Sequence, residues 1–335
     1  MRFSLRLNND LPAAEYVTLA QAAEAYGFDQ FWMSDDLFLR SAPVILATVA
    51  MRTSRIQIGT SIVNPYTLHP ATMAMAAATL DEISGGRFIL GISAGAADFL
   101  KWVGISQDRP LTTVFESVQA VRKLLHGERA AMDGHFLKWT DEAYLRFKPL
   151  RRQIPIYLGA LSPNMLRAIG EWADGGLPLL FPPEHFKVIL PYIQEGAAKA
   201  GRPLDEIDLS GCVWCAISED RRAAERALAA KIAYYGHALS PLIWASLGVT
   251  AEEFAPIEQT VMAENDMEKA ITMVTPAMMQ IGLVGEGKDL IPRLEALASL
   301  GLRHISFGPP LGTDRLQAIQ IIGREIIPHF KGRHA

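Results

Sequence analysis

Two adjacent carboxylates, Asp35 and Asp36, follow the apolar run that begins at Phe31. A pair of acids can share a proton or divide the roles of general acid and general base. Neighbouring residues of a strand point to opposite faces, so both acids can reach one ligand only if the chain turns between them. We therefore expect one acid to serve a site and the other to be solvated or to cap a helix.

Two further motifs could carry chemistry. The stretch GISAGAAD, with Gly91 and Gly95, precedes a helical stretch, so its backbone N–H groups could bind an anion there or simply form a tight turn. The stretch CVWC contains the only two cysteines. Because Cys212 and Cys215 are three residues apart in a predicted strand, they point to opposite faces and are not expected to form a redox pair.

The elements that must position these residues alternate along the chain. Apolar, β-rich runs are separated by stretches of helical composition, for example at 12–26, 69–83 and 111–126. Strands that are nearly continuous apolar runs, each followed by a helix, indicate a parallel sheet buried on both faces. Glycine stands at several helix-to-strand junctions (AYGFDQF, ISGGRFI, WADGGLPL and LGLRHIS), where we expect it to end a helix. The eight β-rich runs are FSLRL, FDQFWMS, RIQIGTSIV, RFILGIS, IPIYLGA, GGLPLLF, IDLSGCVWCAI and RHISFG.

Eight strand–helix units predict a closed α/β architecture, the (β/α)8 or TIM barrel. An open Rossmann sheet should show G-x-G-x-x-G after its first strand, but FSLRL is followed by NNDLP. In a barrel the chemistry lies at the carboxyl ends of the strands, which are rich in small residues and amides here and poor in titratable groups. We therefore expect a bound cofactor to supply the reactivity. The strand ends are 6–8, 34–36, 61–64, 93–97, 159–162, 180–182, 216–218 and 307–310.

Several other kinds of site are not expected. No cluster of His, Asp or Glu has the spacing of metal ligands, so we predict no metal site. The chain has neither a G-x-S-x-G nucleophile motif nor a Walker A motif.

Two segments interrupt the repeat within one predicted domain, 1–335. The segment at about 129–150 contains Asp133-Gly134, a turn signal, and is predicted to form a hairpin after the fourth helix. The apolar, Met-rich segment at 236–276 follows the seventh strand. It could cover a substrate at the active-site face or be a helical pair packed on the barrel.

The composition indicates a cytoplasmic protein that binds small molecules. Of 335 residues, half are apolar and the formal net charge is −4, with no basic face for nucleic acid. Two cysteines fit a reducing compartment. The apolar runs fall short of the roughly 20 residues that span a membrane, and the N-terminus turns polar too early for a signal peptide.

The stretch GTSIVNPYTLHPATMAMAAATLDEISGGRFILGISAG resembles the bacterial-luciferase-like barrel superfamily. Within that superfamily the likeness is closest to methylenetetrahydromethanopterin reductase, which uses the deazaflavin coenzyme F420. It recurs at IPIYLGALSPNMLRAIGEWADGGL, IQEGAAKAGRPLDEIDL and GLVGEGKDLIPRLEALASLGLRHISFGPPLG, so it runs along the whole chain.

The resemblance implies a role for specific residues. Asp35 would contact the deazaflavin head, and Ser61-Ile62 would form a non-prolyl cis peptide that supports the back of the ring. The helix at 70–83 would help to form a homodimer. The other residues implied to bind the cofactor are Asn64, Gly95, Ala96, Gly159, Ala160, Leu161 and Ser162.

Three positions depart from the pattern of the deazaflavin enzymes that the chain resembles. Those relatives usually have His at the position of Asp36 and an acid at the position of Arg6, and they often have an acid at the position of Ala96. We therefore expect Asp36 and Arg6 to act on the substrate rather than on the cofactor, and to set this chain apart from its relatives.

Three functions remain open from the sequence. The first is hydride transfer between coenzyme F420 and an organic substrate, which requires mainly that two flat partners be held face to face. The second is an FMN-dependent monooxygenase or reductase; the phosphate dianion of FMN usually requires a Lys or Arg, which GISAGAAD and LGALSPN lack. The third is a barrel that binds a ligand without redox turnover.

Overall fold

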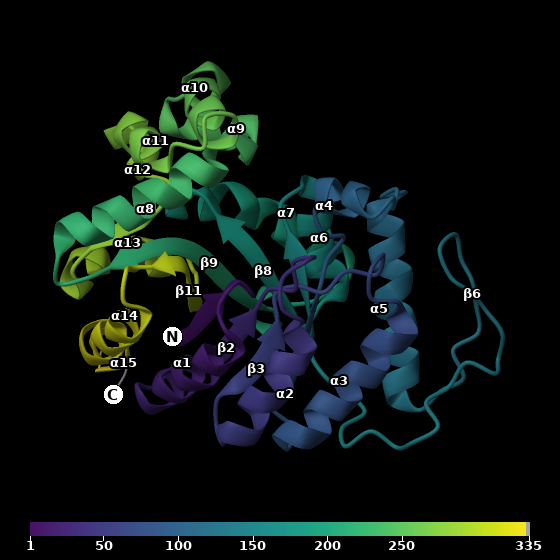
Figure 1. The fold of residues 1–335 in the computed structure, drawn as a ribbon. Coiled ribbons are helices and arrows are strands. Elements are labelled where there is room, and N and C mark those ends of the chain that lie inside the picture. The colour runs from purple at the N-terminus through teal and green to yellow at the C-terminus, as the bar shows by residue number, and fades with distance from the viewer. Residues whose placement is uncertain (333–335) are drawn as a thin grey trace.

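Eight parallel strands close into a barrel in the computed structural model, which describes residues 1–332 (Figure 1). Strand β9 pairs with β8 on one side and with β11 on the other, and β11 pairs with β1, so the ring has no open edge. Each of the eight predicted runs overlaps one of these strands, which confirms the barrel. In order around the ring they are β1 (Arg2–Leu7), β2 (Gln30–Met33), β3 (Gln57–Thr60), β4 (Phe88–Ile92), β7 (Ile156–Ala160), β8 (Gly175–Leu180), β9 (Asp208–Ile217) and β11 (His304–Leu311).

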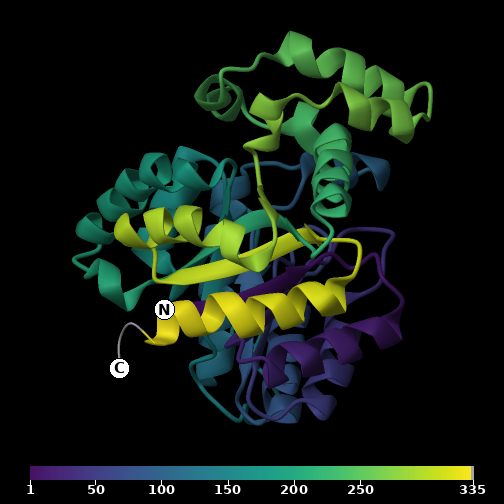
Figure 2. The same cartoon turned by 90° about the vertical axis from the view of Figure 1, so that its left-hand side faces the viewer.

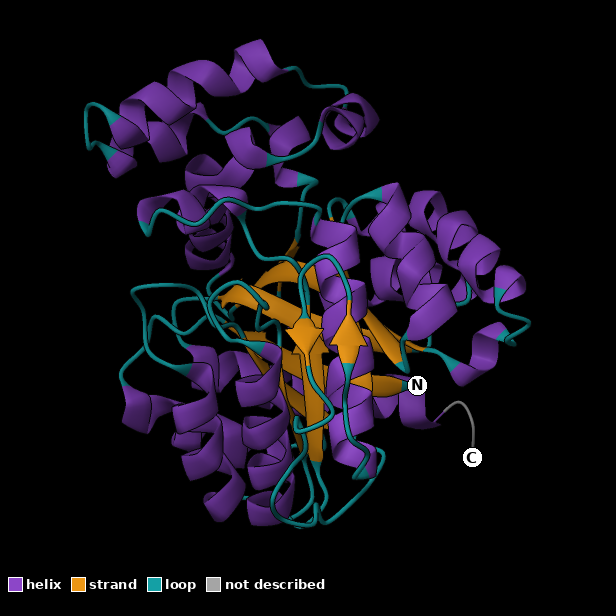
Figure 3. Cartoon of the chain, turned by 90° about the vertical axis from the view of Figure 1, so that its right-hand side faces the viewer, coloured by secondary structure: helices purple, strands orange, loops and turns teal. Residues whose placement is uncertain are grey.

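Helices surround the barrel on its outside (Figure 3). Their apolar faces and the outward side chains of the strands form the main core, in which residues such as Phe3 and Leu46 are fully buried. This burial on both faces is why most of the strands are nearly continuous apolar runs. The helices are α1 (Ala13–Ala25), α2 (Ala42–Arg52), α3 (Pro70–Ser84), α4 (Ala97–Trp102), α5 (Pro110–His126), α6 (Pro163–Trp172), α7 (Phe186–Lys199), α8 (Arg221–Tyr235), α13 (Gly287–Ser299), α14 (Arg315–Ile321) and α15 (Ile327–Lys331).

The glycines at the helix-to-strand junctions have two different causes. Gly27, Gly85 and Gly301 have positive φ just after a helix, as predicted. The prediction was wrong at Gly175 and Gly176, which lie inside β8. A Cβ atom at Gly175 would approach the Tyr157 ring to 2.5 Å, so close packing inside the barrel, and not a helix end, requires glycine there.

The inside of the barrel has an apolar middle and a polar floor. Trp32, Ile89, Tyr157, Leu177 and Cys212 form the middle. Cys215 instead belongs to the outer core, so the two cysteines face opposite sides of β9, as predicted. Both thiols are free and buried, and burial raises the pKa of each.

At the amino end of the strands, Asp208 forms the centre of the polar floor. Its carboxylate accepts hydrogen bonds from the Tyr157 hydroxyl at 2.6 Å and from His304 Nδ1 at 3.1 Å, and it pairs with Arg2 Nη1 at 2.8 Å. The other ring nitrogen of His304 lies 2.9 Å from Ser4 Oγ. The floor therefore joins four strands through one mostly buried carboxylate.

The segment after α5 contains the predicted hairpin, made of β5 (Met132–Asp133) and β6 (Lys138–Trp139). Buried Glu116 of α5 holds it, because its carboxylate accepts hydrogen bonds from the backbone N–H groups of His135, Phe136 and Leu137.

The segment after β9 is helical. Short helices follow α8 and pack on it and on one another, with a core of their own that includes Phe254 and Ile257. They project beyond α8, away from the barrel (Figure 2). The segment is helical, as in the second of the two alternatives, but it packs mainly on α8 rather than on the barrel. The helices are η3 (Gly236–Ala238), α9 (Pro241–Leu247), α10 (Ala251–Met262), α11 (Met267–Met273) and α12 (Pro276–Met279), and an unpredicted short strand, β10 (Leu283–Gly285), then pairs with β9.

Candidate functional site

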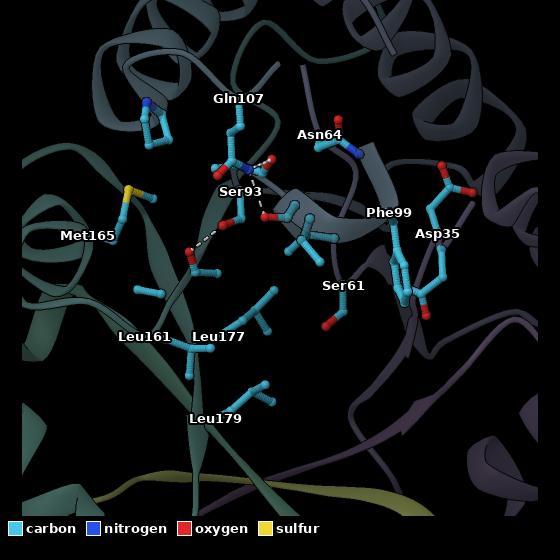
Figure 4. A pocket seen from close by; sticks show the side chains of 18 of the residues that line it. Asp35, Ser61, Asn64, Ser93, Phe99, Gln107, Leu161, Met165, Leu177 and Leu179 are labelled. Carbon is cyan, nitrogen blue, oxygen red and sulfur yellow. Dashed lines mark hydrogen bonds between the residues drawn. The ribbon is translucent and has the colours of Figure 1, made fainter. Parts of the chain in front are cut away.

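A cavity of about 410 Å³ lies at the carboxyl ends of the strands (Figure 4). The structure brings all the residues proposed from the sequence into its lining, although they come from several different strand ends. They are Arg6, Asp35, Asp36, Ser61, Ile62, Asn64, Gly95, Ala96, Gly159, Ala160, Leu161 and Ser162.

Both adjacent acids face this cavity, contrary to the expectation that only one would. The reason is that β2 ends at Met33, so the alternation of a strand no longer applies at Asp35 and Asp36. Asp35 also holds a helix end, because its Oδ1 accepts a hydrogen bond from the backbone N–H of Ala42 at 2.8 Å, at the start of α2. Asp36 Oδ2 accepts a hydrogen bond from Ser34 Oγ at 3.1 Å.

The carboxyl group of Asp35 has a raised pKa. Burial disfavours its charged form, and the nearby charge of Asp36 adds to this effect, whereas the hydrogen bond from Ala42 opposes it. A partly desolvated acid at a cavity wall is suited to binding a polar edge of a ligand.

Arg6 reaches from β1 to the chain that follows β3. Its Nε donates a hydrogen bond to Ser61 Oγ at 3.0 Å, and its Nη2 lies 3.5 Å from the backbone oxygen of Ser61. The Ser61–Ile62 peptide bond is cis, as predicted. Just before it, the Thr60 hydroxyl donates to the backbone oxygen of Gly91 and accepts from its N–H, so a side chain replaces strand pairing where the chain leaves the sheet.

Fixed amide groups form a polar edge of the cavity. Asn64 Oδ1 accepts hydrogen bonds from two backbone N–H groups of its own turn, each at 3.1 Å. Gln107 Nε2 donates to the backbone oxygens of Ala94 and Gly95 at 2.9 and 3.0 Å. The remaining amide atoms of Asn64 and Gln107 have no hydrogen-bond partner among residues 1–332, so they can bind a ligand.

Another part of the wall is formed by the loop from β7 to α6. Ser162 caps α6 by accepting a hydrogen bond from the N–H of Met165 at 3.4 Å, and both residues line the cavity. The start of this ten-residue helix therefore presents its positive end to the cavity, where it favours an anion. Within the described lining the only basic side chain is Arg6, which is bonded to Ser61 instead.

The sequence reasoning missed several residues of the lining. Leu177 and Leu179 could have been found, because they occupy alternate, inward positions of β8. Together with Leu161 they form an apolar side of the cavity, apart from Asn64 and Asp35 (Figure 4). Ser93 and Ala94 belong to the predicted strand end 93–97. The sequence gives no signal for the others, which depend on how loops and the short α4 pack: Leu37, Phe99, Leu100, Gln107, Pro110 and Met165.

Two findings concern the chain as a whole rather than the cavity. No helix within residues 1–332 is both long and apolar enough to cross a membrane. Among solved structures, the coenzyme F420-dependent tetrahydromethanopterin reductase from Methanopyrus kandleri superposes with a TM-score of 0.93 at 30% sequence identity, over 98% of this chain and 99% of that one.

Sequence comparison gives the same relationship. The chain is 34% identical to the 5,10-methylenetetrahydromethanopterin reductase of Methanolobus tindarius, over 98% of this chain and 100% of that protein. It is 32% identical to the reductase of the same name from Archaeoglobus fulgidus, over 99% and 100%. The family model described as luciferase-like monooxygenase matches residues 1–304. The chain therefore belongs to the luciferase-like family.

Proposed function

We propose that this chain is an oxidoreductase that transfers a hydride between coenzyme F420 and an organic substrate. The observation that carries the proposal is the cavity itself, which has an apolar side, a fixed polar edge and a helix start at another wall. A planar deazaflavin with a phosphodiester tail needs these three surfaces. The whole-length similarity to F420-dependent reductases supports the same cofactor.

The residues present fit this cofactor. Leu177, Leu179 and Ile62 offer apolar surface for a flat ring, and Asp35 and Asn64 offer polar atoms at its edge. When bound, the deazaflavin ring accepts or donates the hydride, and the protein holds the two reactants in contact.

The tail of the cofactor has its own candidate partners. Backbone groups at Gly95 and Ala96, and those of the loop Gly159, Ala160, Leu161 and Ser162, would bind it together with the start of α6. A phosphodiester carries one negative charge and can be held by N–H groups alone. In this proposal Arg6 and Asp36 face the substrate.

FMN is the alternative cofactor, supported by the monooxygenases of the family. Its terminal phosphate is a dianion that Lys or Arg usually binds, and the α6 end of the cavity has neither. Titrating the protein with each cofactor, with quenching of tryptophan fluorescence as the signal, separates the two. We expect binding of coenzyme F420 well below the concentration needed for FMN; tight FMN binding without a response to F420 would overturn the assignment.

Turnover is tested separately, with reduced coenzyme F420 under anaerobic conditions and a panel of substrates that includes methylenetetrahydromethanopterin, imines, ketones and enones. Recovery of the absorbance of oxidised F420 reports hydride transfer. Binding without turnover of any member of the panel would favour a barrel that only binds its ligand.

We also propose that the chain, as one domain of 335 residues, forms a homodimer in the cytoplasm. Four apolar side chains on the neighbouring helices α2 and α3 are exposed: Val44, Met51, Met75 and Ile83. An exposed apolar face of this kind is a typical subunit contact. Light scattering coupled to gel filtration should report a dimer, and Met51→Glu, which places a charge on a side chain 75% exposed in the monomer, should shift it towards monomer.

A further inference from the structure

Lys231 of α8 is a mostly buried cation whose contacts are aromatic. Its Nζ lies 3.8 Å from the centre of the Tyr235 ring and 5.1 Å from that of Trp214. No carboxylate oxygen of residues 1–332 lies within 4.0 Å of it. Aromatic faces attract an ammonium group but do not neutralise it, so the charge of Lys231 is uncompensated by any direct contact.

Arg6 is a second cation of this kind. Its guanidinium is bonded to Ser61, and no carboxylate oxygen of the described residues lies within 4.0 Å of it either. Burying charge without a counter-ion is costly, and proteins rarely keep such groups unless a ligand uses them.

The barrel register brings the two cations to the same part of the mouth. Leu5 of β1 pairs with Phe307 of β11, so the next residue, Arg6, lies beside Gly308. Gly308 in turn pairs with Trp214 of β9, against whose ring Lys231 lies. Gly308 has no side chain, so no side chain of β11 stands between Arg6 and Trp214 at this level, and a Cβ atom at Gly308 would lie 3.9 Å from the Trp214 ring.

Electrostatics agrees with this placement. The pKa of Lys231 is lowered to about 8, first by burial and then by repulsion from Arg6, while Asp10 and Asp36 oppose the shift. The charges of Asp36 and Asp10 are thus near enough to raise the pKa of Lys231, but neither acid forms an ion pair with it. A ligand with a negative charge would relieve the repulsion between the two cations.

We propose that Arg6 and Lys231 bind an anionic group of the substrate, a carboxylate or a phosphate. This inference rests on the proposed function and narrows it to substrates with a negative charge near the reacting centre. Arg6 and Asp36 line the cavity, whereas Lys231 lies beyond them on α8. The substrate would therefore extend from the cavity past Arg6 towards Lys231, and the cofactor tail would remain at the start of α6.

The test measures Lys231 itself and requires no turnover. The protein is acylated with a trace of acetic anhydride over a range of pH, so that the acetate released stays far below the concentration of the added anion, and the extent of reaction at each lysine is read by mass spectrometry. Samples with inorganic phosphate or acetate are compared with chloride at the same ionic strength. Lys199, whose side chain is 72% exposed, serves as the control within each sample.

We expect phosphate, acetate or both to raise the apparent pKa of Lys231 by about one unit, which slows its acylation at pH 8 about fivefold. Lys199 should not respond. Whichever of phosphate and acetate acts more strongly identifies the anionic group.

Variants of Arg6 complete the test. Arg6→Met should abolish the response of Lys231 to the anion, whereas Arg6→Lys, which keeps the positive charge, should retain part of it. No response in the wild-type protein to either anion would overturn the inference. So would a response that disappears when coenzyme F420 is bound, because the two cations would then belong to the cofactor site.

The same samples keep the two proposals apart. If coenzyme F420 fails to bind but the anion still raises the pKa of Lys231, the cofactor assignment fails and the anion site stands. If coenzyme F420 binds but neither anion changes the pKa of Lys231, the cofactor assignment stands and the anion site fails.

Discussion

Both ends of the barrel contain charged side chains, but those at the floor have partners of opposite charge and, among the described residues, the cations at the mouth do not. At the floor, Asp208 is bonded to Arg2, Tyr157 and His304, so its charge is balanced by direct contacts. At the mouth, Arg6 and Lys231 have no carboxylate partner among residues 1–332. Polar groups that satisfy one another stabilise the fold, whereas groups left without partners are available to a ligand.

The floor also shows that spacing alone does not make a site. Ser4, His304 and Asp208 are joined by distances of 2.9 and 3.1 Å, the order of contacts found in a Ser-His-Asp nucleophile. Yet Ser4 and His304 are fully buried, so no substrate can reach the hydroxyl. Access, rather than residue type, separates the two ends.

The largest effect is expected at the floor. Asp208→Asn should lower the free energy of unfolding by about 3 kcal/mol, because it removes the charge that balances Arg2 and leaves Tyr157 and His304 with a weaker acceptor. Urea denaturation followed by circular dichroism measures the loss. Coenzyme F420 should still bind to the folded variant.

Asp205→Asn is the matched control, since Asp205 is exposed and lies only three residues away. It should change stability by less than about 0.5 kcal/mol. If both variants were equally stable, the floor network would not hold the barrel together.

The pH dependence of the free energy of unfolding should also reflect the ionisation of Asp208. Burial opposes ionisation of Asp208, but the hydrogen bonds from His304 and Tyr157 and the charge of Arg2 outweigh it, so its pKa is lowered. A lowered pKa stabilises the fold above the unfolded value of about 4, and this contribution is lost as the pH falls below it. Between about pH 5 and pH 2, the stability difference between the wild type and Asp208→Asn should shrink by about half. A difference that stays constant over this range would contradict the assignment.

Asp35 serves both the site and the fold, because it lines the cavity and accepts a hydrogen bond from the first turn of α2. Asp35→Ala should weaken binding of coenzyme F420 about tenfold and, through loss of the bond to Ala42, cost about 1 kcal/mol of stability.

Asp35→Asn distinguishes these roles. Its amide oxygen can still accept the hydrogen bond from Ala42. Because the raised pKa of Asp35 means that its charge destabilises the fold above that pKa, the neutral variant should be at least as stable as the wild type at pH 7. Weaker F420 binding in a fully stable Asp35→Asn would assign the charge to the cofactor. Unchanged affinity in both variants would make Asp35 purely structural.

The sequence predicted what depends on local pattern. All eight barrel strands could be found because they are β-rich, nearly continuous apolar runs that alternate with helical stretches, and the rule that sites lie at strand ends, together with the family resemblance, located twelve residues of the lining. What it could not predict depends on tertiary packing. Lys231 looks like one more surface lysine of an amphipathic helix until the Trp214 ring of β9 is placed against it. Likewise, Gln107 is an ordinary loop residue in the sequence.

The smallest effect links Asp36 to the pKa of Lys231. Asp36 raises the pKa of Lys231, although burial and Arg6 dominate the shift. Asp36→Asn should therefore lower the apparent pKa of Lys231 by a few tenths of a unit, about 0.3, measured by the same acylation experiment. Stability should hardly change, because the amide oxygen can still accept the bond from Ser34. Asp98→Asn, an exposed acid ion-paired with Lys101, should leave Lys231 unaffected. If Asp36→Asn raised the pKa of Lys231, or left it unchanged, the charge of Asp36 would not act on Lys231. The two residues would then not face the same space, and the proposed anion site would lose one of its supports.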